Sequence, residues 1–153
     1  MSTTNISLYL VPVAWFIALA PRGYTLVAYK LHSKSKQGVE MRNPRALTAQ
    51  AQGDSTLSPL IRDRIIRAES AQLNGAENLG FFAAAVVAGN AANLDTTLLN
   101  GLTLAYIGSR VLYNVIFVAN SSEKFGFVRT LVFLSGIAFS SSLFVLAGKK
   151  IAL

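Results

Sequence analysis

The fold of this chain is decided by one stretch, Arg67-Ala-Glu-Ser-Ala-Gln-Leu-Asn-Gly-Ala-Glu-Asn78, which runs directly into the apolar block 79–92. The block predicts a membrane helix, and the last five residues of the stretch place one carboxylate, Glu77, and two carboxamides, Asn74 and Asn78, where that helix enters the membrane. Polar and ionisable groups inside a membrane helix are costly, and they indicate a functional site by default. The stretch therefore predicts both a membrane protein and the position of its site.

The composition agrees with this interpretation. The chain has 153 residues, 52% hydrophobic and 14% charged, which is too apolar for an ordinary soluble domain. Blocks 98–119 and 128–147 are each about 20 residues long, enough to cross a ~30 Å hydrocarbon core as a helix. The shorter apolar block 6–20 can continue through 23–31, and block 79–92 needs the polar stretch before it to complete a crossing. We therefore expect an all-α integral membrane four-helix bundle, a single domain over 1–153, with spans at about 6–30, 60–92, 98–119 and 128–147.

The chain has a net charge of +7, and its basic residues cluster between the first two expected spans and in the adjoining ends of those spans. The basic residues there are Lys30, Lys34, Lys36, Arg42, Arg45, Arg62, Arg64 and Arg67. Lys and Arg accumulate on the cytoplasmic side of membrane proteins, so loops 32–57 and 120–127 are expected in the cytoplasm. An anionic leaflet would attract the same residues. Nucleic acid is not an expected partner, because no groove-reading motif accompanies the charge.

Chemistry is further limited by residue types that the sequence lacks. The chain has no Cys, which excludes disulfides, thiol catalysis and thiolate metal sites. Its one His, His32, lies among Lys and Ser just past the first expected helix. No metal site is therefore expected.

Four costly side chains from three expected helices fall at similar heights in the membrane. Counted at about 1.5 Å per residue from the non-cytoplasmic helix ends, Glu77 lies about 25 Å up, Arg129 about 27 Å, Tyr113 about 22 Å and Arg110 about 18 Å. Two arginines beside one carboxylate leave surplus positive charge, and Arg is suited to bidentate capture of carboxylates. An anionic ligand that enters from the cytoplasm would balance such a site.

A structural alternative explains the same residues without a ligand. Glu77 and Arg110 would pair with each other, and Arg129 would extend to the membrane interface. Asn74 and Asn78 would then serve as hydrogen-bonding groups between helices. Spacing alone does not decide between the two interpretations.

Packing features concern the first and last expected helices. Pro21 interrupts the first one and requires a neighbouring helix, or a local adjustment, to satisfy the carbonyl group that it frees. Small residues, among them Gly136, would allow the helices to approach closely.

Residues 67–82 resemble the signature of the membrane-associated proteins in eicosanoid and glutathione metabolism, the MAPEG family. That signature is an Arg-rich run, then Ala-His/Gln-x-Asn-x-x-Glu-Asn/Tyr and an aromatic residue. It is matched here by Ala71, Gln72, Asn74, Glu77 and Asn78. Further on, Ser109-Arg110-Val-Leu-Tyr113 resembles the family's third-helix Arg and aromatic, and Arg129-Thr130 resembles its fourth-helix Arg-Ser/Thr. The resemblance covers the chain from about residue 60 onward.

The resemblance implies a homotrimer in an internal membrane such as the endoplasmic reticulum, with glutathione as co-substrate bound between subunits near the cytoplasmic side. It implies catalytic roles for Arg129 and, after it, Arg110, because a nearby Arg favours the thiolate. The implied glutathione-binding residues are Arg67, Asn74, Glu77, Tyr113 and Thr130.

Two hypotheses about function follow. The first is a glutathione-dependent membrane transferase or isomerase that acts on a lipophilic substrate. The alternative is a non-catalytic accessory subunit or lipid-binding scaffold that assists a partner enzyme. Two departures from the family pattern favour the alternative: Ser70 stands where Arg is usual, and Phe117 where Tyr is common. A transporter is disfavoured, because the chain has no inverted repeat.

Overall fold

The computed structural model describes residues 4–36, 38–39, 42–119 and 123–152. The elements are η1 (Ser7–Tyr9), α1 (Leu10–His32), η2 (Pro44–Ala46), α2 (Leu47–Gly53), α3 (Pro59–Ala91), α4 (Thr96–Ala119) and α5 (Glu123–Ile151). These residues contain no strand, so the all-α prediction is confirmed for the described part of the chain.

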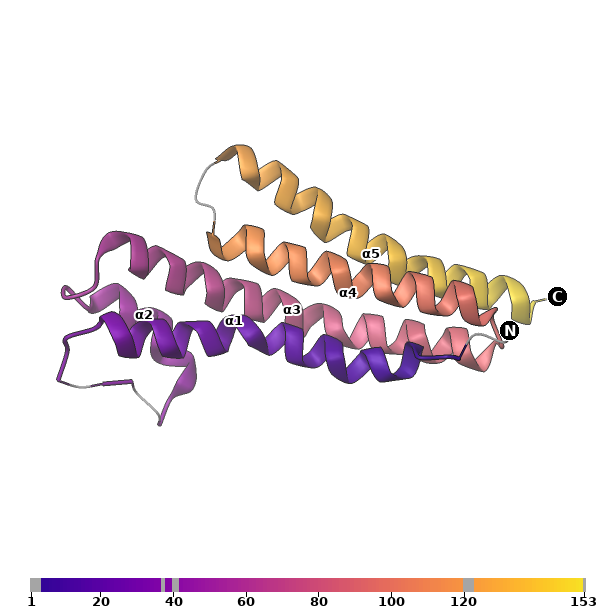
Figure 1. The fold of residues 1–153 in the computed structure, drawn as a ribbon, viewed down its shortest axis with the longest axis horizontal. Helices are drawn as coiled ribbons and strands as arrows, with labels where there is room; N and C mark the ends of the chain where they lie inside the picture. The colour runs from indigo at the N-terminus through magenta and orange to yellow at the C-terminus, as the bar shows by residue number, and fades with distance from the viewer. Residues whose placement is uncertain (1–3, 37, 40–41, 120–122, 153) are drawn as a thin grey trace.

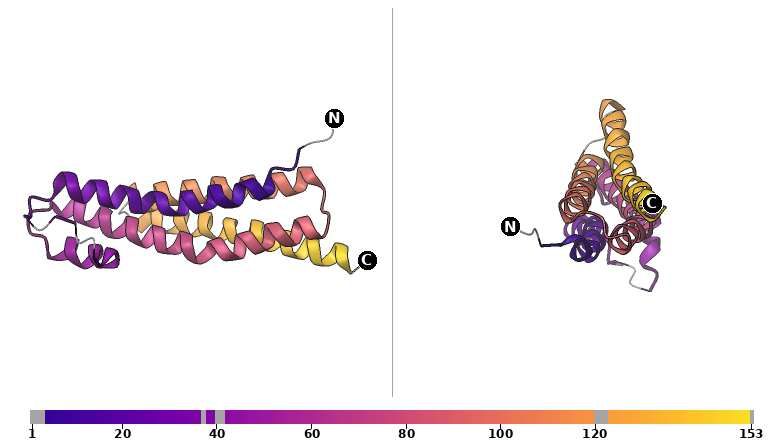
Figure 2. Two further views of the ribbon diagram at one scale, coloured as in Figure 1. Left: turned by 90° about the horizontal axis from the view of Figure 1, so that it is seen from below. Right: turned by 90° about the vertical axis from the view of Figure 1, so that its right-hand side faces the viewer.

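Four long helices, α1, α3, α4 and α5, run along the same axis (Figures 1 and 2). α3 packs against each of the other three. α1 and α4 end, and α3 and α5 begin, toward one end of the molecule, while both termini lie toward the other. The two predicted cytoplasmic loops therefore join their helices toward the same end, where the short helix α2 packs on α3.

Within the part of the chain that the structure describes, three segments are long and apolar enough to cross a membrane: Ser7–His32, Thr96–Ala119 and Phe125–Ile151. They correspond to the expected spans 6–30, 98–119 and 128–147 and identify an integral membrane protein. The expected span 60–92 coincides with α3, which is not among these segments: charged residues crowd its first half, and Asn74, Glu77, Asn78 and Asn90 lower the hydropathy of its second half. At about 1.5 Å per residue α3 is about 50 Å long, so its charged half can extend beyond the hydrocarbon core.

The gap that Pro21 leaves in α1 is filled from α4. Pro21 has no N–H to bond to the carbonyl of Ile17. Asn114 supplies the missing donor, with its Nδ2 2.9 Å from the oxygen of Ile17. The expectation that a neighbouring helix satisfies the freed carbonyl is therefore confirmed.

We expect Asn114→Leu to lower the stability of the folded protein by about 0.6 to 1.7 kcal/mol, the range for one hydrogen bond between membrane helices. Thermal unfolding in detergent measures the change. Pro21→Ala restores the backbone donor, so Asn114→Leu should cost less in a Pro21→Ala background. Equal costs in the two backgrounds would contradict this role for Asn114.

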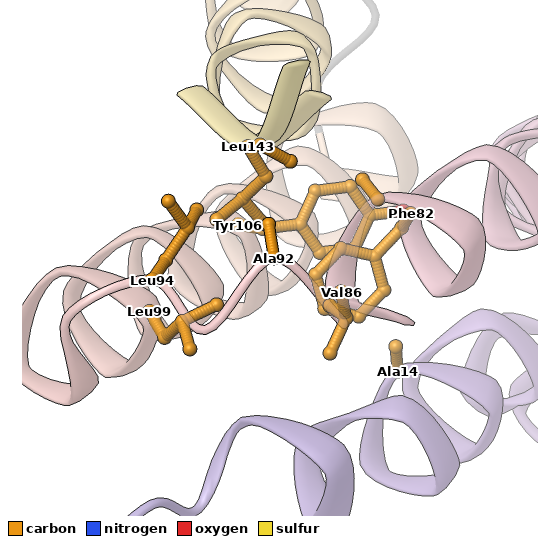
Figure 3. Close-up of a cluster of buried hydrophobic side chains, with 10 residues drawn as sticks. Ala14, Phe82, Val86, Ala92, Leu94, Leu99, Tyr106 and Leu143 are labelled. Atoms are coloured by element: carbon orange, nitrogen blue, oxygen red, sulfur yellow. The ribbon is translucent and has the colours of Figure 1, made fainter. Parts of the chain in front are cut away.

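An apolar core fills the half of the molecule near the termini (Figure 3). The rings of Phe82 on α3 and Tyr106 on α4 stack with centroids 3.8 Å apart, and Leu143 of α5 is fully buried in the same cluster. Gly89 allows the close approach of α4, because a Cβ there would lie 2.7 Å from a methyl carbon of Leu99. The four residues singled out by height in the sequence, Glu77, Arg110, Tyr113 and Arg129, are not members of this cluster.

Asp54 ties the loop end together. Its Oδ2 accepts hydrogen bonds from the hydroxyls of Tyr29 and Ser33, and its Oδ1 accepts from both the N–H and the hydroxyl of Thr56. The backbone carbonyl of Asp54 accepts from Arg62 at 2.8 Å. The hydrogen bonds from Ser33 and Thr56 hold the pKa of the Asp54 carboxyl well below its usual value.

This depressed pKa predicts how stability depends on pH. The Asp54 carboxylate stabilises the fold at pH values above its unfolded pKa of about 4, and this stabilisation is lost as the pH falls through the lower, folded pKa. We expect Asp54→Asn to lower the melting temperature at neutral pH and to flatten its fall below about pH 4. An Asp54→Asn profile parallel to that of the wild type would contradict this prediction, which a series of melting curves can test.

Candidate functional site

Arg110 of α4 is buried, with 5% of its surface exposed. Its Nη2 donates to the carbonyl of Phe133 on α5 at 2.9 Å, and its Nη1 to Oδ1 of Asn74 on α3 at 3.4 Å. Gly136 makes room for the guanidinium, because a Cβ there would collide with Nη2 and lie 2.9 Å from Cζ. Gly136 was expected to let helices approach, and here it admits a side chain.

Aromatic rings surround the Arg110 guanidinium. Its Cζ lies 5.1 Å from the ring centre of Tyr106, 5.7 Å from that of Tyr113 and 5.2 Å from that of Phe133. No carboxylate of the described residues lies within ion-pair distance of Arg110, and its buried Nε has no hydrogen-bond partner among them. The alternative Glu77–Arg110 pair is therefore wrong for this protomer, and Arg110 is a buried cation held by dipoles and ring faces.

Arg129 lies at the far end of a stack that starts at Arg110. The rings of Tyr113 and Phe117 stack with centroids 5.5 Å apart, and the Cζ of Arg129 sits 4.4 Å from the ring centre of Phe117. Unlike Arg110, Arg129 is partly exposed. Phe117, which replaces the family's tyrosine, thus positions the more accessible arginine through a cation–π contact.

Glu77 lies on the outer face of the protomer and forms no ion pair with the described residues. It belongs to a stripe of exposed α3 residues, Leu73, Glu77, Gly80, Ala84, Val87 and Ala91. Their alternating spacing of four and three residues is the repeat by which helices pack along a common seam. A carboxylate at membrane depth on such a stripe is costly unless another surface covers it.

The remaining predicted residues contact helix ends or their own helix. Nη2 of Arg67 donates to the carbonyl of Val118, in the last turn of α4, where carbonyl groups lack helical partners. Thr130 is exposed and donates to the carbonyl of Gly126 in its own helix. Asn78 bonds the carbonyl of Asn74 in the same helix. Asn74 thus connects α3 to α4 by accepting a hydrogen bond from Arg110, whereas the hydrogen bond of Asn78 stays within α3.

Sequence reasoning missed an ion pair between Arg22 and Glu69. Nη1 of Arg22 lies 2.6 Å from Oε1 of Glu69, which also accepts from the hydroxyl of Thr25 at 2.6 Å. Glu69 is 8% exposed. Arg22 lies ten residues before the end of α1, and Glu69 lies ten residues after the start of α3. The two residues are therefore equally far from the loop end, and this could have indicated the pair in the sequence.

The MAPEG family model matches residues 8–149 of the chain. Searches with the chain found no matching curated protein and no matching solved structure.

Proposed function

The chain belongs to the MAPEG family, and on that premise we propose that it is a glutathione-dependent membrane transferase or isomerase that acts on a lipophilic substrate. The observation that carries the proposal is the cationic stack. Arg110 is buried without a carboxylate among the described residues, and two stacked rings lead from it to the accessible Arg129. This surplus of positive charge suits an anionic co-substrate.

In the proposed reaction Arg129 stabilises the thiolate of glutathione, because a neighbouring guanidinium favours the deprotonated form. The thiolate attacks an electrophilic carbon of the lipophilic substrate, forming a carbon–sulfur bond while the electron pair of the broken bond moves to the leaving group. Asn74, Glu77, Arg67 and Thr130 are proposed to hold the polar ends of glutathione. Tyr113 would stack or hydrogen-bond beside the thiol.

A homotrimer is part of the proposal. All four long helices would cross the membrane, and the exposed α3 stripe would pack against neighbouring subunits. Gly80 and Ala84 permit close approach on that stripe, and burial against a second copy would remove Glu77 from lipid. Glutathione would then bind between subunits at the loop end. We place that end in the cytoplasm from its positive charge, and the protein in the endoplasmic reticulum from its family.

The second candidate is an accessory subunit or lipid-binding scaffold for a partner enzyme. It is favoured by Phe117, whose ring offers Arg129 a contact but offers glutathione no hydroxyl. Ser70 likewise bonds the carbonyl of Ile66 in its own helix and supplies no charge where the family has Arg.

Calorimetry of glutathione binding to the detergent-purified protein separates the two candidates. We expect binding in the micromolar to low-millimolar range, lost in Arg129→Ala. Arg45→Ala serves as the matched control, because Arg45 is an exposed arginine of the loop. No binding heat from a correctly folded protein would refute the transferase and favour the scaffold.

A further inference from the structure

Two pockets lie on either side of Tyr29 and Ser35 at the loop end of α1. The first has a volume of about 430 Å³ and includes Leu26, Lys30 and Val39 in its wall. The second has a volume of about 540 Å³ and includes Lys36. Both volumes fall in the range of sites that hold small organic ligands.

The walls of the two pockets differ in chemistry. Leu26, Val39 and the ring of Tyr29 make the first pocket mostly apolar, with Lys30 as its charged residue. The second carries polar side chains, among them Gln50 and Thr56. An apolar pocket beside a polar one matches an amphiphile, whose hydrocarbon part and headgroup need different surroundings.

Across the two pockets the lysines outnumber the carboxylates, with Lys30 and Lys36 against Asp54. The Asp54 carboxylate keeps its charge, but its two oxygens already accept four hydrogen bonds from Tyr29, Ser33 and Thr56. A ligand therefore meets the ammonium groups of Lys30 and Lys36, both of which are exposed. These groups favour an anionic headgroup.

The position of the pockets identifies the source of the amphiphile. They surround the last turns of α1, which is long enough to cross a membrane and ends at His32. A helix of that length places its end at the level of the lipid headgroups. We propose that the two pockets bind one anionic phospholipid of the leaflet on the loop side, with an acyl chain against Leu26 and Val39 and the phosphate beside Lys30 and Lys36.

The test compares phosphatidic acid with phosphatidylcholine binding to the full chain in detergent, measured by native mass spectrometry. We expect selective retention of phosphatidic acid, weakened about fivefold by Lys30→Ala, the effect of one lysine near an anionic lipid. Lys34→Ala removes the same charge from the same loop, but Lys34 lines neither pocket, so this control should bind phosphatidic acid like the wild type.

A second variant tests the apolar pocket. Val39→Trp should fill this pocket and weaken phosphatidic acid binding. The melting temperature of Val39→Trp in phosphatidylcholine should equal that of the wild type, and Lys34→Ala should again bind phosphatidic acid like the wild type. If Lys30→Ala and Lys34→Ala weaken phosphatidic acid binding equally, the proposal is overturned in favour of diffuse attraction to the basic loop. Glycerol phosphate that competes as strongly as phosphatidic acid would overturn it in favour of a soluble anion site. Neither result bears on glutathione binding.

Discussion

Arg129→Ala is expected to lower glutathione-dependent turnover by about 100- to 1,000-fold, the loss that follows removal of one preorganised group that stabilises charge at a reacting centre. Arg129 is the partly exposed end of the cationic stack, where its guanidinium lies over the ring of Phe117. Its removal should therefore spare the fold. The measurement is kcat/KM for glutathione with a hydrophobic aryl halide as electrophile, beside a melting curve.

Two further variants separate charge from position. Arg129→Lys keeps the positive charge but loses the planar guanidinium, so it should retain part of the turnover. Phe117→Leu removes the ring that holds Arg129 and should cost less than Arg129→Ala. Wild-type turnover in a correctly folded Arg129→Ala protein would refute the assignment. Arg110→Ala is less informative, since it also removes a buried side chain that packs against three rings.

The sequence predicted heights in the membrane better than directions around each helix. Counting residues from the helix ends put Arg110, Tyr113 and Arg129 near one level, and the structure joins them in one stack. The same count put Glu77 beside Arg110, whereas Glu77 faces outward. The rotation of α3 depends on tertiary contacts that local periodicity does not contain. At Gly75, for example, an added Cβ would lie 3.1 Å from the Cα of Ala18.

The ion pair was missed for a related reason. The expected first span, about 6–30, includes Arg22, but the sequence does not fix which way the Arg22 side chain faces from that helix. In the structure α1 continues through Pro21, because Asn114 of a distant segment satisfies the carbonyl of Ile17. Once the helix is continuous, Arg22 and Glu69 stand at the same distance from the loop end. Whether the two side chains face each other depends on how α1 packs against α3, and the sequence of neither helix alone contains that packing.

Glu69→Ala is expected to reduce the free energy of unfolding by about 3 to 5 kcal/mol, the usual cost of removing one partner of a buried ion pair. The change removes a carboxylate oxygen that accepts from both the Arg22 guanidinium and the Thr25 hydroxyl. Thermal unfolding in detergent measures it. Asp63→Ala is the matched control, because Asp63 is an exposed acidic residue of the same helix.

The double variant Arg22→Met with Glu69→Leu should recover most of the lost stability, because apolar residues of similar volume can replace a buried pair. Glu77→Gln should behave in the opposite way to Glu69→Ala, leaving the melting temperature of the protomer nearly unchanged while weakening glutathione binding. If Glu69→Ala melts like Asp63→Ala, the ion pair does not stabilise the fold. The two carboxylates of residues 67–78 therefore have separate tests. Glu69 has a structural role only if Glu69→Ala lowers stability. Glu77 has a ligand-binding role only if Glu77→Gln weakens glutathione binding without lowering stability.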